Sequence, residues 1–247
     1  MSLYRDEGVV LRTIRLGEAD RIVTLATPEH GKVRAVAKGV RKTKSRLGGR
    51  VEPLSHVSML CWRGRELDTI TQVEVLDHFR PIREDLDRMS QAMTMLEVVD
   101  QVAVERHAMP ELFRMLVGAL RSLSDSYSPF VAGAFLWKLL TLEGLAPVVD
   151  RCAGCGSQTA ELVAFDVMED GFLCRSCRRG QGVRPGTVEL VRRILGGDLA
   201  RVLAEPPSPE SLEMEKLAIE AVEHHLDRRL RVPRAMADTK GQSPQAG

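Results

Sequence analysis

Apolar and polar residues alternate in short runs along the first eighty positions of the chain. The runs are rich in Val, Ile and Thr, and turn residues such as Gly and Pro separate them. This pattern predicts five strands, at residues 7–14, 21–27, 32–38, 56–62 and 67–76. Five short strands with turn signals between them indicate an all-β barrel or sandwich.

The strand count fits both an OB-fold and an SH3-like barrel. A long basic loop, residues 39–49, follows the third predicted strand. The OB-fold binds single strands and oligosaccharides on one face and its adjoining loops. The loop would lie beside that groove, and it therefore favours an OB-fold for the N-terminal part of the chain.

The spacing of apolar positions changes after residue 81. Ile82, Leu86, Met89 and Met93 lie three or four positions apart, as on one face of an amphipathic helix. Further helices are predicted at residues 110–120, 130–142, 188–195 and 209–230. The helix at 130–142 is apolar on nearly every side, so we expect it at the centre of a bundle.

The predicted fold class is α+β, a five-stranded OB-fold barrel followed by an all-α domain with an inserted four-cysteine zinc module. Residues 1–80 would form the barrel. Residues 81–148 and 184–232 would form the helical domain, and residues 149–183 the insert, which resembles a zinc ribbon. Residues 233–247 have the polar, Gly- and Pro-containing composition of a disordered tail.

Positive charge is concentrated in one stretch of the chain. The chain has 35 basic and 34 acidic residues, and eight of the basic ones lie between Gly31 and Arg50, where there is no Asp or Glu. The rest therefore holds 27 basic residues against 34 acidic ones. Such a concentrated cationic stretch is typical of a polyanion site. The plainer alternative is a solvated, charge-rich hairpin.

The eight basic residues are the predicted DNA-binding set: Lys32, Arg34, Lys38, Arg41, Lys42, Lys44, Arg46 and Arg50. Strand alternation places the first three on one face, and residues 33, 35 and 37 on the other. Residues 39–49 hold few apolar side chains to bury, so they are predicted to form a mobile loop. Binding through phosphates would be insensitive to sequence and sensitive to salt.

Aromatic side chains that stack on bases are scarce in the predicted barrel. They are Tyr4, Trp62 and Phe79. We expect Trp62 to plug the barrel interior rather than to stack on bases, and we expect Cys61 to be a buried thiol. With so few stacking platforms, affinity should come mainly from phosphate contacts.

Four of the five cysteines form two C-x-x-C pairs. Cys152 pairs with Cys155 and Cys174 with Cys177, and eighteen residues separate the pairs. This spacing is typical of zinc sites, because each tight turn supplies two thiolates to a tetrahedral set. The residues between the pairs have the pattern of a short hairpin, as in zinc ribbons. We predict one structural Zn²⁺ ion; the alternative is four unrelated reduced thiols.

Several observations argue against an enzyme. Four thiolates leave no open coordination position, so the predicted metal site is structural. The sequence has no Walker A loop, no nucleotide-binding glycine motif and no carboxylate cluster with metal-ligand spacing. Two non-catalytic alternatives to a DNA-binding protein stay open: a zinc-ribbon adaptor that binds RNA, and an interaction protein whose basic loop meets an acidic partner.

The sequence predicts a cytoplasmic protein that does not enter a membrane. The N-terminus is charged too early for a secretory signal peptide. The most apolar stretch, residues 130–149, is interrupted by Lys138 and Glu143, and its pattern favours a core helix over a membrane span.

These features together resemble the RecO family of bacterial recombination mediators and DNA repair proteins. The resemblance covers about residues 3–230, and the four-cysteine insert fits the zinc-containing members. The matching segments are Gly8–Leu11, Gly17–Leu25, Gly31–Val33, Ala37–Lys42 and Ser45–Gly49.

The resemblance implies a non-catalytic, nucleoid-associated protein of DNA recombination and repair. Such a protein binds single- and double-stranded DNA and anneals complementary strands. The implied partners are RecR and the C-terminal tail of the single-strand-binding protein. Together they load the recombinase onto strands that the single-strand-binding protein coats after DNA damage.

Overall fold

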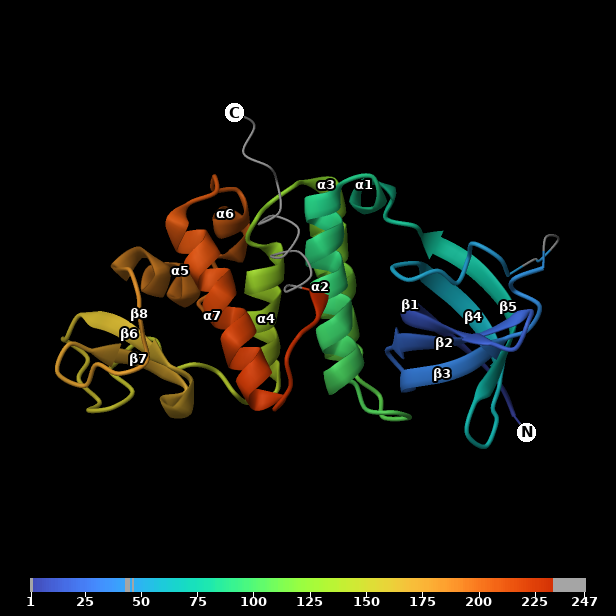
Figure 1. The fold of residues 1–247 in the computed structure, drawn as a ribbon, viewed down its shortest axis with the longest axis horizontal. Coiled ribbons are helices and arrows are strands. Elements are labelled where there is room, and N and C mark those ends of the chain that lie inside the picture. The colour runs from blue at the N-terminus through green and yellow to red at the C-terminus, as the bar shows by residue number, and fades with distance from the viewer. Residues whose placement is uncertain (1, 43–44, 46, 233–247) are drawn as a thin grey trace, which may run out of the picture. The chain divides into compact units, whose positions relative to one another are not determined.

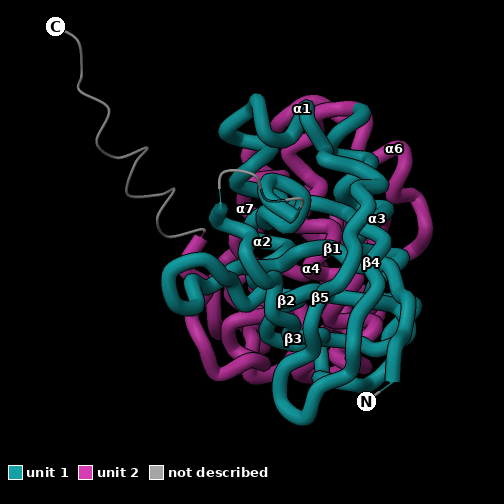
Figure 2. Tube along the Cα trace, turned by 90° about the vertical axis from the view of Figure 1, so that its right-hand side faces the viewer, with its two compact units in different colours: residues 1–125 teal, residues 126–247 magenta. Residues whose placement is uncertain are grey.

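The structure, a computed structural model, describes residues 2–42, 45 and 47–232. It divides into two compact units, residues 1–125 and 126–247 (Figure 2). The predicted disordered tail, residues 233–247, lies outside the described residues. The predicted domain boundaries at residues 80, 148 and 183 stay predictions.

Five strands close into a barrel in the first unit (Figure 1). They are β1 (Leu3–Leu16), β2 (Asp20–Thr27), β3 (Gly31–Ala37), β4 (His56–Trp62) and β5 (Asp68–Asp77). The strand order is β1-β2-β3-β5-β4, and β1 also pairs with β4, which closes the barrel. Neighbouring strands are antiparallel except β3 and β5, which pair in parallel. The prediction of an OB-fold barrel is confirmed.

The first strand is longer than the sequence pattern predicts, because it has two partners. Its first half pairs with β4 from Leu3 to Val9, and its second half pairs with β2 from Val9 to Leu16. The register shifts between Val10 and Arg12, where a β-bulge bends the strand from one partner to the other.

The barrel core follows from alternation along the strands. In β3, Val33, Ala35 and Ala37 are buried in the barrel core, and Lys32 and Arg34 lie on the outer side, as predicted. The same alternation brings Val23 and Leu25 of β2 and Met59 and Cys61 of β4 into this core. The basic side chains of β3 therefore stand on the outer surface of the barrel.

Helices of the first unit cover part of that outer surface. They are α1 (Arg80–Arg83), α2 (Leu86–Val102) and α3 (Pro110–Asp125). The side chain of Asp85 caps α2 by accepting a hydrogen bond from the backbone N–H of Arg88, 2.9 Å away. Both α2 and α3 lie against β2, and the outward-facing Thr24 and Ala26 of that strand are buried.

The second unit contains a helical core and a small sheet. Its helices are α4 (Val131–Leu142), α5 (Pro185–Leu195), α6 (Leu199–Leu203) and α7 (Pro209–His225). Nine of the twelve residues of α4 are buried, which confirms its predicted place at the centre. It packs on α5 and α7, and Gly133 lets it approach α7 closely: a Cβ there would lie 2.8 Å from Sδ of Met214.

The small sheet forms the module between α4 and α5. Its strands are β6 (Leu162–Asp166), β7 (Gly171–Cys174) and β8 (Gln181–Gly182), in the order β7-β6-β8. A 3₁₀ turn, η1 (Val167–Glu169), joins β6 to β7. The predicted hairpin between the two cysteine pairs is thus present.

Candidate nucleic-acid interface and metal centre

The cationic stretch leaves the barrel at the end of β3, and its first residues are anchored. The backbone N–H of Gly39 donates to Oδ1 of Asp20 at 2.7 Å, and the N–H of Arg41 donates to the carbonyl oxygen of Ala19 at 3.0 Å. The Arg41 guanidinium also donates to the carbonyl oxygen of Glu18 at 2.9 Å. The start of the stretch therefore has a fixed position beside the β1–β2 turn.

Apolar residues of the same stretch pack into the barrel. Val40 is 6% exposed, Val51 is fully buried, and Leu47 packs against the same core. The prediction that residues 39–49 have too few apolar side chains to bury is wrong in this respect, because Val40 and Leu47 pack against the barrel core. Residues 43, 44 and 46 lie outside the described residues, so the predicted mobility of the loop stays a prediction.

Two of the eight predicted DNA-binding residues are engaged by helix α2 and the segment that follows it. The Lys32 ammonium donates to the backbone carbonyl oxygen of Asp100 at 2.5 Å and lies 3.8 Å from its carboxylate. The Arg34 guanidinium lies 3.7 Å from the carboxylate of Glu105. The two residues share the outer face of β3, whereas Lys38 lies in the turn after the strand. The charges of Lys32 and Arg34 are partly neutralised from within the first unit.

Four others lie at the surface on the described parts of the stretch. Lys38, Arg41, Lys42 and Arg50 are all exposed. The Arg50 guanidinium donates to the carbonyl oxygen of Val73 at 3.3 Å. Among the described residues, no carboxylate forms an ion pair with any of these four. The two remaining predicted residues, Lys44 and Arg46, lie outside the described part of the chain.

Trp62 does not plug the barrel. It is 44% exposed, whereas the neighbouring Cys61 is fully buried. Successive side chains of a strand point to opposite faces, so Cys61 and Trp62 cannot both point inward. The prediction for Cys61 is confirmed, and burial raises the pKa of its thiol to about 12. The prediction for Trp62 is wrong, and strand alternation was the signal that would have corrected it.

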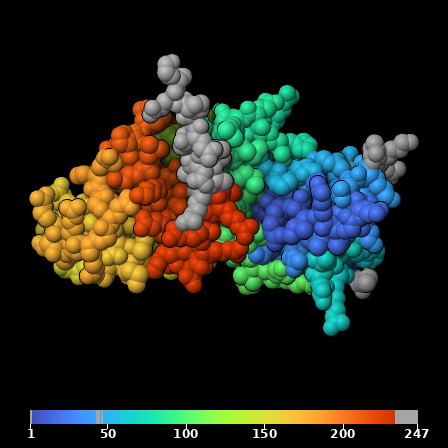
Figure 3. Space-filling model, in the orientation of Figure 1, coloured from blue at the N-terminus to red at the C-terminus, as the bar shows by residue number. Residues whose placement is uncertain are grey.

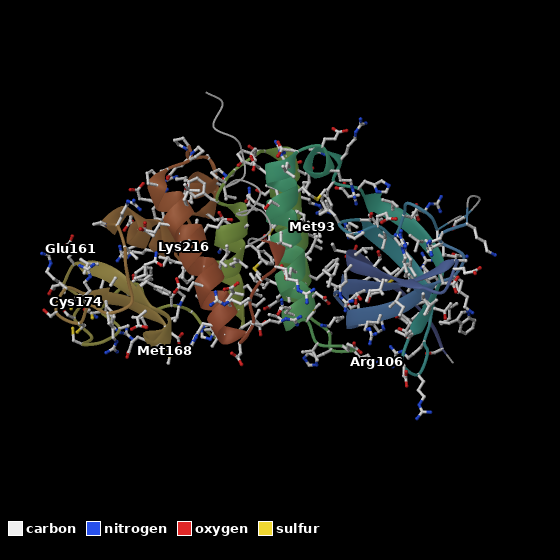
Figure 4. All side chains as sticks on the ribbon, in the orientation of Figure 1. Met93, Arg106, Glu161, Met168, Cys174 and Lys216 are labelled. Atoms are coloured by element: carbon white, nitrogen blue, oxygen red, sulfur yellow. The ribbon has the colours of Figure 1, made fainter. Side chains whose placement is uncertain are left out.

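The four predicted metal ligands come together in the second unit. The sulfur atoms of Cys152, Cys155, Cys174 and Cys177 all lie within 4.8 Å of one another. Figure 4 shows Cys174 at the far end of the small sheet, among these sulfur atoms. The Sγ atoms of Cys155 and Cys174 are 3.8 Å apart, and a tetrahedral ion with sulfur ligands at ~2.3 Å requires a separation of roughly 3.8 Å. The cluster could therefore hold a metal ion.

Backbone N–H groups favour the thiolate form of Cys152. The N–H of Cys174 donates to Sγ of Cys152 at 3.3 Å. Desolvation acts to raise the pKa of Cys152, but N–H donors, led by that of Cys174, outweigh it and lower the pKa to about 6. Hydrogen bonds with Cys155 and Cys174 raise the pKa of Cys177 to about 12. A bound cation would favour the thiolate form of every ligand.

Glycines allow the chain to fold closely around the sulfur atoms. A Cβ on Gly154 would lie 3.1 Å from Cβ and 3.3 Å from Sγ of Cys177. A Cβ on Gly171 would lie 2.8 Å from Val148. Gly156 has a φ of +73°, a conformation that L-residues rarely adopt. Space therefore restricts residues 154 and 171 to glycine, and backbone conformation favours glycine at 156.

Aromatic packing connects the small sheet to the helical core of the same unit. The rings of Phe165 and Phe172 lie 5.0 Å apart, and Phe165 meets Trp137 of α4 edge-on at 5.7 Å. The indole N–H of Trp137 donates to the carbonyl oxygen of Met214 at 3.3 Å. The position of β7, which ends at Cys174, therefore depends on the same apolar core as α4 and α7.

A cavity of about 670 Å³ lies between α7 and the small sheet. Val167 and Ile219 supply apolar lining, and Lys216, which Figure 4 labels on α7, supplies positive charge. Glu220 and Glu223 also line it. Because it combines charges of both signs, this cavity does not favour a polyanion.

The chain matches known proteins along nearly its whole length. The family model described as "Recombination protein O N terminal" matches residues 1–79, and the one described as "Recombination protein O C terminal" matches residues 83–234. A curated relative from a Nocardioides species, named DNA repair protein RecO, is 43% identical over 238 residues. The aligned region is 93% of this chain and 97% of the relative.

Proposed function

Because the chain belongs to the RecO family of DNA repair proteins, we propose that it is a non-catalytic, DNA-binding recombination mediator. It binds single- and double-stranded DNA without reading sequence and anneals complementary strands. It also helps to load the recombinase onto strands that the single-strand-binding protein coats. Its partners are RecR and the C-terminal tail of the single-strand-binding protein, and it acts at the nucleoid in the cytoplasm.

One observation above all supports DNA binding, the exposed cationic surface at the end of β3. Lys38 and Lys42 are exposed there, and no described carboxylate neutralises them. The hydrogen bond from Gly39 to Asp20 fixes where this surface begins. The phosphate backbone of DNA presents a repeating negative charge, which complements several nearby cations whatever the base sequence.

The same charges account for annealing. Two complementary strands repel each other through their phosphates. Cations that reach both backbones lower this repulsion, and contacts that do not read bases leave the bases free to pair. The exposed residues Lys38, Arg41, Lys42 and Arg50 are the described candidates for such contacts, and Lys44 and Arg46 complete the proposed set.

The ion in the four-cysteine cluster is Zn²⁺ in this proposal. Four thiolates suit zinc, and they fill a tetrahedral site completely. The ion thus supplies structure, holding β7 and the two knuckles together. The backbone N–H donors that lower the pKa of Cys152 support a thiolate site.

Among the residues that the structure describes, the four cysteines are the one group of His, Cys, Asp and Glu side chains close enough to share an ion. A metal-dependent nuclease holds its ions with carboxylates near the scissile phosphate. In the described part of the chain, no helix is both long and apolar enough to span a bilayer.

A strand-annealing assay tests the proposal. Two complementary oligonucleotides, one with a fluorophore and one with a quencher, are mixed with and without the protein, first bare and then coated with the single-strand-binding protein. We expect faster annealing in both cases, and no cleavage products with Mg²⁺ or Mn²⁺. Unchanged annealing rates would overturn the proposal. Competition between DNA and RNA of equal length tests the alternative of an RNA-binding adaptor.

A further inference from the structure

The exposed ring of Trp62 stands at the end of β4. The first unit contains three other aromatic residues, of which Phe79 and Phe113 are buried and Tyr4 is partly buried. Trp62 leads into the β4–β5 hairpin, which stands out from the surface in Figure 3. A tryptophan ring exposed to this degree beside a solvent-facing hairpin is available to a ligand.

The neighbours of Trp62 extend this surface across the barrel. Leu3 of β1 lies opposite Trp62 in the strand register and is 47% exposed. On the other side, Thr69 of β5 pairs with both Trp62 and Val36 of β3. Since neighbouring strands lie ~4.8 Å apart, Trp62 and the outer face of β3 are roughly 10 Å apart. The ring therefore lies within reach of a strand bound at the cationic end of β3.

Two cations lie near the ring. Arg5, two residues after Leu3 on β1, shares the outer face with Trp62, and Arg65 is exposed in the hairpin loop; neither forms an ion pair with a carboxylate among the described residues. The guanidinium of Arg63 instead lies over the ring of Tyr4, 5.4 Å from its centroid. Glu66 is the acidic residue of the hairpin loop. An aromatic ring beside unpaired arginines suits a nucleic-acid strand, in which bases alternate with phosphates. An apolar protein surface would leave these two charges without partners.

The platform is held in place before any ligand binds. The backbone N–H of Arg63 donates to the carbonyl oxygen of Ser2 at 2.8 Å, and the N–H of Gly64 donates to Oδ1 of Asp68 at 2.8 Å. Arg106, labelled in Figure 4, donates to the carbonyl oxygen of Gly64 at 3.1 Å. Because the hairpin is already fixed, it loses little conformational entropy when a ligand binds. More of the favourable energy of a stacked base therefore remains as binding affinity.

We propose that Trp62 stacks on a base of single-stranded nucleic acid, while Arg5 and Arg65 bind the flanking phosphates. This inference rests on the proposed function, since it adds a base-contacting site to the DNA-binding surface of the same barrel. It also supplies a preference for single strands over duplexes. Bases within a duplex are stacked on each other and do not offer a face to Trp62.

The intrinsic fluorescence of the full chain tests the proposal, because the chain has two tryptophans and Trp137 is fully buried. The probes are an oligothymidylate, an abasic oligomer of the same length and a duplex. We expect the oligothymidylate alone to quench the emission. The variant Trp62→Ala should bind oligothymidylate roughly 5- to 160-fold more weakly, which corresponds to the loss of one base–aromatic stack, and should bind the abasic oligomer like the wild type.

Two variants serve as controls. Trp62→Phe keeps a ring for stacking, so it should retain most of the affinity and lose the quenching. Tyr127→Ala removes an aromatic side chain of the second unit that is 43% exposed. It should change neither the affinity for oligothymidylate nor the fluorescence quenching. Thermal unfolding checks that each variant is folded.

The failure of this site and the failure of the proposed function give different results. If gel shifts show binding but Trp62→Ala binds oligothymidylate like the wild type, the stacking site is overturned and the proposed function stands. The site is also overturned if the variant alters the sedimentation of the free protein and not its DNA affinity, because the face then contacts another protein copy. If the wild type binds no oligomer, both proposals fail.

Discussion

The ammonium group of Lys32 donates a hydrogen bond to the backbone carbonyl oxygen of Asp100, 2.5 Å away, in the last turn of α2. The same Asp100 accepts a hydrogen bond from Arg12 of β1 through its carboxylate. A cation at a helix C-terminus is favourable, because the last carbonyl groups carry partial negative charge. Lys32 therefore joins β3 to α2. The concentration of basic residues in the sequence predicts, in contrast, that Lys32 contacts DNA.

We expect Lys32→Ala to act on stability more than on DNA binding. The variant removes a hydrogen bond from a charged group whose side chain is 17% exposed, which should lower the free energy of unfolding by about 1–3 kcal/mol. Affinity for an oligonucleotide should stay close to that of the wild type. Urea unfolding and fluorescence anisotropy measure the two quantities on the same preparation.

Lys42→Ala is the matched control. Lys42 is exposed and has no carboxylate partner among the described residues, so its loss should change stability by less than about 0.5 kcal/mol. It should weaken DNA binding. A Lys32→Ala protein with wild-type stability and reduced affinity would show that Lys32 is available to DNA after all.

The cationic stretch should set the salt dependence of binding. If about five of its basic groups contact phosphates, the log–log slope of affinity against salt on single strands is roughly −3.5. Changing Arg41, Lys42, Lys44 and Arg46 together to Ala should make the slope less negative, by up to about 2.8. Anisotropy titrations over a range of salt concentrations measure it. The control variant, Arg41→Lys with Arg46→Lys, keeps the charge and should keep the slope of the wild type. If the wild type, the control and the four-alanine variant all have the same slope, the DNA site lies elsewhere.

The four-cysteine cluster should bind one metal ion that stabilises the second unit. Cys174→Ser should lose the metal and lower the melting temperature, because a structural site contributes binding energy to folding. DNA binding by the barrel should persist. Metal content is measured by mass spectrometry of the purified protein.

Cys61→Ala is the control for metal content, since Cys61 lies in the barrel core and not in the cluster. It should keep the same metal-to-protein ratio as the wild type. Equal metal content in Cys174→Ser and the wild type would contradict the ligand assignment.

His56 should make stability depend on pH. It is 3% exposed, and its Nε2 lies 3.4 Å from the carboxylate of Glu7, although neither ring nitrogen forms a hydrogen bond with a described residue. Desolvation by burial lowers its pKa in the folded protein, although the carboxylate of Glu7 opposes this. The unfolded chain therefore takes up a proton on His56 more readily than the folded chain. The contribution of His56 to the free energy of unfolding is fully present above the pKa of histidine in the unfolded chain, about 6.5. It falls as the pH drops below that value.

Urea unfolding at several pH values between about 7.5 and 5 measures how the free energy of unfolding changes with pH. For one proton this slope reaches about 1.4 kcal/mol per pH unit. His56→Leu should remove that contribution to the slope. His78→Ala, which changes an exposed histidine of the same unit, should leave it unchanged. A slope that survives in His56→Leu would assign the pH dependence to another group.

Local pattern predicted the barrel strands and the cysteine cluster well. The alternation in β3 and the spacing of the four cysteines depend only on residues near one another in the chain, and both predictions are confirmed. The prediction for Trp62 is wrong although it also concerns a local feature. The place of Trp62 next to the inward-facing Cys61 determines the direction of its side chain.

Long-range contacts could not be predicted from such patterns. The pairing of Lys32 with Asp100 joins residues 68 positions apart, and it exists because α2 ends beside β3. The burial of Val40 depends likewise on distant residues, because the core that it joins is built from all five strands. Composition described the 39–49 segment correctly as basic, but it could not tell which apolar side chains the barrel would accept.

The closeness of Cys152 and Cys174 has a consequence for how the second unit is kept intact. A metal ion held by their sulfur atoms and those of the other two cysteines ties together segments 22 residues apart. Such a cross-link withstands the thiol reductants that open disulfides, and its integrity follows the supply of the ion instead. In a cell starved of that ion, newly made chains would have an intact barrel and a loosened β6–β7 hairpin. The supply of the metal, rather than the redox state of the cell, would therefore determine how much of the second unit is fully folded.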